Sequence, residues 1–242
     1  MGVFRFVSFT LPALAVVLFC LHYLIFGPRR AKPAQETRFI PRMSLLERLV
    51  HAVTIVSLLV LAGTGWLAAI GIGPALHGWY LIAHCTAGSF FTLSLVITAF
   101  LWADACCFEA HDGRWLRGSG GYLLGKECLP AGRFDGGQKL MFWVMLVLGL
   151  AVLVTATLPF LKWFGTDGQS LLLRCHRYSG LLLILVTIKH VYLVAVAKPA
   201  GLRAMTVGTV SAEWATRYHP LWLVAGASRP CQPDGENGEP KQ

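Results

Sequence analysis

The sequence has little charge. Only 14% of its 242 residues are Asp, Glu, Lys or Arg and 12 are acidic, whereas 55% are hydrophobic. The mean hydropathy of +0.60 is typical of an integral membrane protein and excludes an ordinary soluble domain. The net charge of +9 comes largely from basic residues gathered between apolar segments, so nucleic acid is not expected as a partner.

Two cysteine patterns are also absent. The seven cysteines include no Cys-x-x-Cys pair and no Cys-x-x-Cys-His motif. Their absence argues against a zinc ribbon and against covalent attachment of haem. No internal repeat or low-complexity segment is present, so a repeat architecture is not indicated either.

Five long apolar segments predict five helices that cross the lipid bilayer, because each reaches the ~20 residues that a span requires. They cover residues 6–26, 49–72, 79–102, 140–161 and 171–196. The predicted fold is therefore an all-α integral membrane protein, with a four-helix transmembrane bundle and one extra N-terminal transmembrane helix. We expect three regions: the extra helix and a basic loop in 1–42, the bundle in 43–224, and a disordered tail in 225–242.

A basic cluster between the first two apolar segments sets the expected orientation. Its members are Arg29, Arg30, Lys32, Arg38, Arg42 and Arg48. Such clusters face the cytoplasm, which predicts a multi-pass protein of the bacterial inner membrane with a cytoplasmic C-terminus. The first segment also resembles a signal peptide, but its length and the arginines directly after it favour a retained span.

Four histidines lie in or beside the apolar segments, where a titratable group is costly and usually functional. His176 and His190 are 14 residues apart in one segment, which on an α-helix is about 21 Å of rise and close to four turns. Their imidazoles therefore face the same way, one near each end of a span. In the predicted topology His51 lies at the depth of His190, and His84 at the depth of His176.

Two histidine pairs at two depths predict two non-covalently bound b-type haems. An imidazole on each side of the iron gives a closed, six-coordinate centre suited to electron transfer, and helical bundles build such centres from facing helices. Three glycines support this interpretation, although glycines also serve close helix packing. Gly88 and Gly180 each follow a candidate ligand by four residues, and Gly65 follows His51 by 14, so all three would leave room for a flat macrocycle.

From residue 43 to residue 223 the chain resembles the cytochrome b (gamma) subunit of membrane-bound respiratory formate dehydrogenases. The superfamily includes the cytochrome b subunits of nickel–iron hydrogenases and thiosulfate reductases. The matching stretches are Ser44-Leu-Leu-Glu-Arg-Leu-Val-His51, His84 with Gly88, Gly137-Gln138-Lys139 before Phe142-Trp143, Cys175-His176, His190-Val-Tyr192, and Trp214 with His219-Pro220-Leu-Trp222. The Gly-Gln-Lys element and the Trp…His-Pro-x-Trp ending point to the formate dehydrogenase branch, whereas residues 1–42 lie outside the resemblance.

The resemblance implies a quinone site at Gly137 and Gln138, beside an inner haem on His51 and His190. Gln138 can donate to or accept from a quinone oxygen. The family has an asparagine where this chain has Asp135, so a carboxylate would take that place.

The resemblance also implies the route of the electrons. They would come from an iron–sulfur beta subunit, enter at an outer haem on His84 and His176, and leave to menaquinone or ubiquinone near the cytoplasmic face. Formate oxidation would belong to a molybdenum or tungsten alpha subunit, with only the quinone reduction site on this chain.

Two alternatives remain open from the sequence. The donor could be a nickel–iron hydrogenase or another dehydrogenase that faces the periplasm. In a more distant alternative, the chain is a transporter or membrane anchor without haem, and its histidines relay protons.

Overall fold

The computed structural model describes residues 2–26, 38–71, 76–124, 128–198 and 201–227. Five helices in these ranges are long and apolar enough to cross a membrane, which confirms the predicted helical membrane fold. They cover Gly2–Phe26, Leu45–Ile70, Gly78–Trp102, Gly136–Leu161 and Gly165–Ala197. Of the predicted disordered tail, residues 225–227 end a short helix, and 228–242 lie outside the described residues, as do basic residues 29, 30 and 32.

Three of the five spans change helix type along their length. The second consists of α2 (Leu45–Leu61), a π-helical turn η1 (Ala62–Trp66) and α3 (Leu67–Ile70). The fourth is α6 (Gly136–Thr157) followed by the 3₁₀ turn η3 (Leu158–Leu161). The fifth is α7 (Gly165–Tyr192) followed by a second π-helical turn, η4 (Leu193–Ala197). The first and third spans are the uninterrupted helices α1 (Gly2–Phe26) and α4 (Gly78–Trp102).

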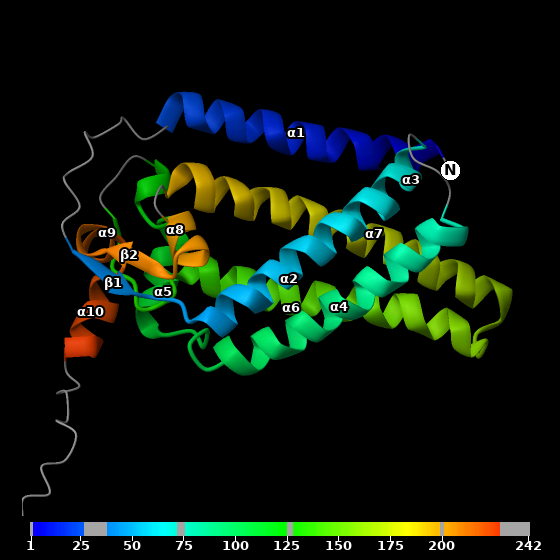
Figure 1. Ribbon diagram of the computed structural model, residues 1–242. Helices are drawn as coiled ribbons and strands as arrows, with labels where there is room; N and C mark the ends of the chain where they lie inside the picture. Colours follow the sequence, from blue (N-terminus) through cyan, green and yellow to red (C-terminus); the bar gives the residue numbers. More distant parts are fainter. Residues whose placement is uncertain (1, 27–37, 72–75, 125–127, 199–200, 228–242) are drawn as a thin grey trace, which may run out of the picture.

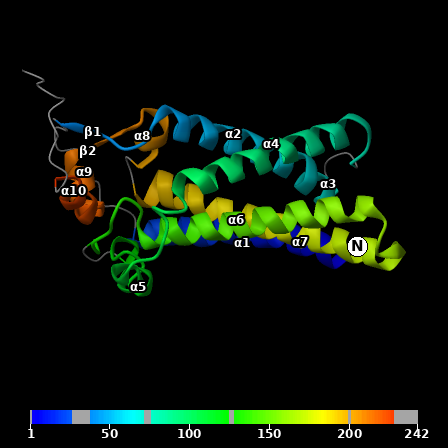
Figure 2. The same cartoon turned by 90° about the horizontal axis from the view of Figure 1, so that it is seen from below.

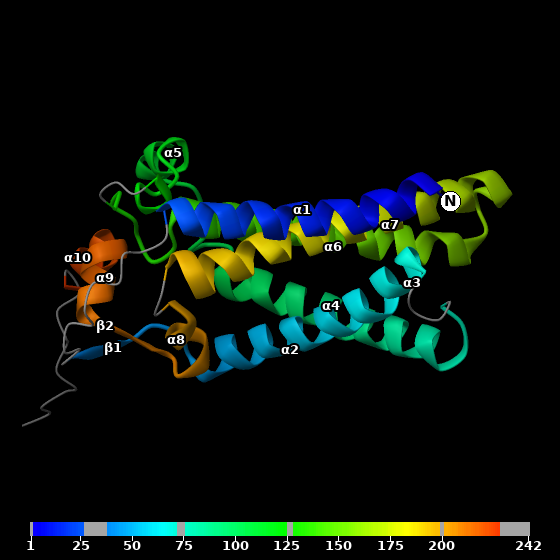
Figure 3. The same cartoon turned by 90° about the horizontal axis from the view of Figure 1, so that it is seen from above.

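The bundle is built from two helix pairs. Helix α2 packs on α4, and α6 packs on α7, while contacts between α4 and α6 join the two pairs. Helix α1 lies along α7 for its whole length (Figures 1 and 3). The structure therefore contains the predicted four-helix bundle and extra helix, and it places the extra helix on the outside of the bundle, against α7.

Short elements gather at one end of the bundle, which we call the capped end (Figure 2). They are α5 (Ala110–Arg117), η2 (Tyr122–Leu124), α8 (Gly201–Thr206), α9 (Ala212–Tyr218), α10 (Pro220–Ala227) and the strands β1 (Phe39–Pro41) and β2 (Thr209–Ser211). The strands pair antiparallel, with Ile40 opposite Val210. The sequence did not predict them, because three residues are too few to show the alternation of a strand.

An apolar cluster fills the middle of the bundle. Its buried members are Leu58, Phe91, Leu95, Leu148 and Leu183. Three of them lie seven residues, or about two helical turns, from the histidines: Leu58 follows His51, Phe91 follows His84, and Leu183 lies midway between the two histidines of α7. The cluster therefore separates the two depths at which the histidines occur.

Helix α1 is attached to the bundle through a backbone carbonyl that has no hydrogen-bond donor within the helix because of a proline. Pro12 has no N–H, so the carbonyl of Ser8, one turn earlier, has no helical donor. Trp66 Nε1 donates to this carbonyl at 2.7 Å, and Ser8 is fully buried. Since lipid offers no replacement for a lost hydrogen bond, a neighbouring helix has to satisfy the carbonyl.

Polar contacts also hold both ends of α1. At one end the Arg5 guanidinium lies beside Gly71, the left-handed residue that ends α3, where a cation complements the helix C-terminus. At the other end His22 contacts the hydroxyl of Tyr192 at 2.5 Å through Nδ1 and the carbonyl of Leu123 at 2.8 Å through Nε2. These contacts fix the position of α1 along α7.

We expect Trp66→Phe to weaken the docking of α1, because it leaves the Ser8 carbonyl without a donor, at a cost of about 1–3 kcal/mol. Adding Pro12→Ala supplies a backbone N–H for that carbonyl and should recover part of the loss. The free energy of unfolding in detergent and hydrogen exchange in α1 measure both effects. Trp163→Phe is the control, since Trp163 is 73% exposed; an equal loss in both tryptophan variants would contradict the assignment.

Candidate functional site

The four predicted histidines form two facing pairs inside the bundle. His51 of α2 faces His190 of α7, with ring centroids 6.4 Å apart and ring planes at 57°. His84 of α4 faces His176 of α7, with centroids 6.3 Å apart and planes at 72°. All four side chains are partly buried. The structure thus brings together the pairs that were predicted from depth alone.

The spacing within each pair fits one metal ion between the two rings. Half of either separation is about 3.2 Å. A bond from a metal to an imidazole nitrogen is about 2 Å long, and the nitrogen lies slightly more than 1 Å from the centre of its own ring. Each pair would therefore be able to hold one iron between its two rings.

Hydrogen bonds fix the tautomers of His84 and His176. The Thr64 hydroxyl donates to the carbonyl of Val60 at 2.7 Å, so it accepts from Nδ1–H of His84 at 2.8 Å. His176 Nδ1 lies 3.0 Å from the carbonyl of Val152, which can only accept. Both rings therefore carry their proton on Nδ1, and Nε2 remains as the free lone pair that a metal needs.

The π-helical turn η1 shapes the surroundings of His84. It contains Thr64, the hydrogen-bond partner, and Gly65, where a Cβ atom would lie only 2.9 Å from Cε1 of His84. Gly65 thus lies at the predicted depth, and its missing side chain makes room for the imidazole ring. Thr64 was missed by the sequence analysis; the signal was a polar residue inside an apolar run, one residue from the predicted Gly65. Such turns are frequent at functional sites.

Open space lies beside the other two predicted glycines. A Cβ atom on Gly88 would meet only Leu61 Cδ2, at 3.9 Å, and one on Gly180 would meet nothing within 4 Å. Both residues follow a histidine by four positions on the same helix face. Unlike Gly65, they border free volume, which is the environment that a flat ligand between the helices requires.

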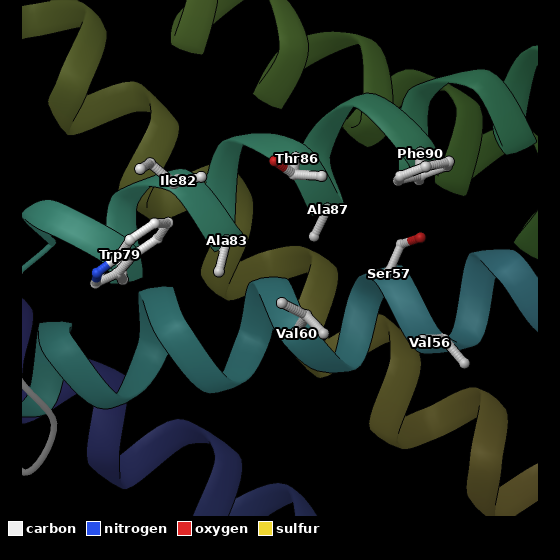
Figure 4. Close-up of a pocket in the computed structure, with 9 residues that line it drawn as sticks. All are labelled: Val56, Ser57, Val60, Trp79, Ile82, Ala83, Thr86, Ala87 and Phe90. Carbon is white, nitrogen blue, oxygen red and sulfur yellow. The ribbon is translucent and has the colours of Figure 1, made fainter.

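A separate groove of about 500 Å³ lies between α2 and α4 (Figure 4). Its lining consists of Val56, Ser57, Val60, Trp79, Ile82, Ala83, Thr86, Ala87 and Phe90. The Ser57 hydroxyl is satisfied by the carbonyl of Val53 at 2.7 Å. The groove includes none of the paired histidines and has little polar surface. The candidate functional site is therefore formed by the two histidine pairs and not by this groove.

The residues predicted to bind quinone lie together at the start of α6, at the capped end. Asp135 is the N-cap of α6: its Oδ1 accepts from the backbone N–H of Gln138 at 2.9 Å, and its own N–H donates to Gln138 Oε1 at 3.0 Å. Gly137 faces Trp115 of α5, where a Cβ atom would lie 2.7 Å from Cη2. The Gln138 side-chain oxygen therefore already accepts one hydrogen bond. The missing side chain of Gly137 allows α5 to pack against α6.

Several charged groups at the capped end are buried, which the sequence analysis did not foresee. Lys198, just after η4, donates to Asp135 Oδ2 at 2.8 Å and contacts His219 Nε2 at 2.8 Å. Arg42, which was expected in the basic loop, is only 6% exposed and donates to the carbonyl of Arg133 at 2.6 Å. Burial lowers the pKa of Arg42 to about 10, so its guanidinium remains charged at neutral pH.

Arg48, another member of the basic cluster, is also bound within the structure. Its side chain donates to the backbone carbonyls of Met205 and Thr206 and so ties α2 to α8. A sequence pattern counts such residues as surface cations, because hydrogen bonds to distant carbonyls leave no local trace in the sequence.

The sequence model of the family described as prokaryotic cytochrome b561 matches residues 42–208. A formate dehydrogenase cytochrome b556 subunit of Haemophilus influenzae is 28% identical over 145 residues, which cover 57% of this chain and 60% of that relative. The nitrate-inducible cytochrome b556(Fdn) subunit of Escherichia coli K12 is 24% identical over 222 residues, covering 84% and 99%. The formate dehydrogenase cytochrome b556(fdo) subunit of the same organism is 25% identical over 196 residues, which cover 76% of this chain and 91% of that relative.

We expect Lys198→Met to lower the free energy of unfolding by roughly 3–5 kcal/mol, because it leaves the buried Asp135 carboxylate without its cation. Adding Asp135→Asn should recover much of this loss, since asparagine still caps α6 without a charge. Denaturant unfolding in detergent measures both variants, with the exposed Lys162→Met as the control. A double variant no more stable than Lys198→Met alone would show that the ion pair is not the cause.

Proposed function

The chain belongs to the prokaryotic cytochrome b561 family, and from this premise we propose that it is the dihaem cytochrome b subunit anchoring a formate dehydrogenase complex in the membrane. The family and the apolar helices make it a membrane cytochrome b that binds haem b. The observation that carries the dihaem proposal is the presence of two histidine pairs, 6.4 and 6.3 Å between ring centroids. The names of the relatives support formate dehydrogenase as the complex.

The four histidines would hold two b haems through their imidazole nitrogens. His51 and His190 would bind the inner one, and His84 and His176 the outer one. When bound, the haems would supply one-electron transfer. The protein's contribution is to hold neutral imidazoles in place: Thr64 and the Val152 carbonyl keep the proton of the outer ligands on Nδ1.

Glycines would leave room for the outer macrocycle. Gly88 and Gly180 border open volume one turn after a ligand, and Gly65 admits the ring of His84. Between the two depths lies the buried apolar cluster around Leu58, Phe91 and Leu183. The two sites therefore differ in depth by about 21 Å along α7, which is most of the ~30 Å hydrocarbon thickness.

The start of α6 is our proposed quinone site. Gln138 Oε1 accepts from the backbone of Asp135, which orients the amide and leaves its nitrogen free to donate to a ligand. Gln138 would therefore donate a hydrogen bond to a quinone carbonyl, and not accept one. The carboxylate of Asp135 accepts hydrogen bonds from the backbone N–H of Gln138 and from Lys198. Its role would therefore be to position Gln138.

The basic residues between α1 and α2 support an inner-membrane orientation with the capped end and the C-terminus in the cytoplasm. Electrons would then arrive from an iron–sulfur beta subunit on the periplasmic side, and formate oxidation would take place on a molybdenum or tungsten alpha subunit. Residues 1–42 would form the added helix and its loop, and 43–224 the dihaem unit. Menaquinone or ubiquinone would accept the electrons on the cytoplasmic side.

The stoichiometry is directly testable. The purified chain should contain two haems b, and acid–acetone should extract both, because the sequence has no Cys-x-x-Cys-His motif for covalent attachment. A pyridine haemochrome assay against protein concentration gives the number. A value near one per chain, or haem that stays with the protein after extraction, would refute the two-pair assignment.

The order of electron transfer predicts different defects for the two ends. In His84→Ala the donor should no longer reduce the inner haem, whereas in His190→Ala it should reduce the outer haem without reduction of quinone. Gln138→Ala should keep both haems and slow only quinone turnover. Donor-driven haem reduction and quinone reduction, measured side by side on each assembled variant, test these outcomes.

Sealed vesicles test the orientation of the same pathway. Inward movement of electrons opposes a potential that is negative inside, by about 2.3 kcal/mol per charge per 100 mV, so turnover should build a potential. Turnover without any potential would place the quinone site on the opposite face. Normal quinone reduction by His190→Ala, together with a reducible inner haem in His84→Ala, would disprove the serial path.

A further inference from the structure

A chain of buried polar groups runs through the capped end to Gln138. It begins at the backbone carbonyl of Gly132 and passes through His219, Lys198 and Asp135. His219 is 0% exposed, Asp135 is 2% exposed and Lys198 is 5% exposed. Three separate parts of the sequence meet here: the start of α6, the segment after η4, and the end of α9.

The direction of each hydrogen bond in this chain follows from its first member. A carbonyl can only accept, so Nδ1 of His219 donates to Gly132 at 2.7 Å. An ammonium can only donate, so Nε2 of His219 accepts from Lys198 at 2.8 Å. His219 is consequently a neutral imidazole with a fixed tautomer.

The surroundings keep His219 neutral. Burial lowers its pKa far below the usual range, and the nearby cations Lys198 and Arg42 lower it further, against a small opposite effect of the Gly132 carbonyl. Arg42 lies 3.4 Å from the same Nε2. A second proton on the ring would be repelled by these two cations. The donors and acceptors in this series of hydrogen bonds therefore stay the same across physiological pH.

Lys198 and Asp135 connect His219 to Gln138. Lys198, held between His219 and Asp135, occupies Oδ2 of the carboxylate at 2.8 Å. This contact leaves Oδ1 to accept from the N–H of Gln138 at 2.9 Å, while the Asp135 N–H takes the Gln138 oxygen at 3.0 Å. With the oxygen bonded to the Asp135 N–H, the NH₂ group is the donor that Gln138 can offer to a quinone carbonyl.

We propose that His219 is a positioning residue for quinone: through Lys198 and Asp135 it fixes the side chain of Gln138 as a hydrogen-bond donor at the quinone site. His219 itself does not touch the quinone. The inference rests on the proposed quinone site and assigns a function to the C-terminal segment, whose Trp…His-Pro-x-Trp sequence had no role. It also explains why a residue 81 positions from Gln138 in the sequence should affect quinone binding.

The test is reoxidation of the dithionite-reduced haems of the purified native complex by short-chain ubiquinone and menaquinone analogues. His219→Leu should raise the half-saturating quinone concentration about tenfold, equivalent to about 1.4 kcal/mol, with an unchanged limiting rate. His219→Gln, whose amide can donate to Gly132 and accept from Lys198, should restore the original value. Thr216→Leu, an exposed change on the same helix, is the control.

A double-mutant cycle distinguishes positioning from mere support of the fold. If His219 acts through Gln138, the variant His219→Leu/Gln138→Ala should bind quinone no more weakly than Gln138→Ala alone. Additive losses, or no rescue by His219→Gln, would overturn the proposal. If His219→Leu fails to assemble, Asp135→Asn replaces it in the cycle, because it keeps the cap but weakens the link to Lys198.

The two proposals can fail separately. An unchanged half-saturating concentration in Gln138→Ala overturns the quinone site and, with it, the positioning role. A raised value in Gln138→Ala combined with an unchanged value in His219→Leu leaves the quinone site standing and removes only the role of His219.

Discussion

Four imidazoles inside an apolar bundle are the constraint on which the rest of this structure depends. Each ring must stay neutral, because a charge in this environment is costly, and each must present a free nitrogen to the space between the helices. Where the structure shows the partners, a threonine hydroxyl and a backbone carbonyl meet these demands. The rings also need space, which Gly65 provides next to His84.

The same scarcity of hydrogen-bond partners in lipid explains how the extra helix is attached. A proline in the middle of α1 would leave a carbonyl unsatisfied, and Trp66 from the second span supplies the missing donor. That tryptophan ends the π-helical turn that also contains Thr64 and Gly65. One local distortion of the second span therefore serves both the site of His84 and the docking of α1.

At the capped end the solution is different, because charges are buried there in pairs and chains. Asp135 caps α6, accepts from Lys198 and is connected through it to His219. Arg42 and Arg48, two members of the basic cluster, are bound to backbone carbonyls of distant segments. The short elements of the capped end thus position the residues of the proposed quinone site, whereas the membrane-spanning helices position those of the proposed haem sites.

The sequence alone determined the fold class, the five spans to within about six residues at each end, and the pairing of the four histidines. These features follow from hydropathy and from helical periodicity, which are local properties of the chain. Only the tertiary structure decided the partners of those features: Thr64 for His84, Trp66 for Ser8, and the path from His219 to Gln138. Hydrogen bonds between residues far apart in sequence depend on how the helices pack against one another, and no local pattern records that packing.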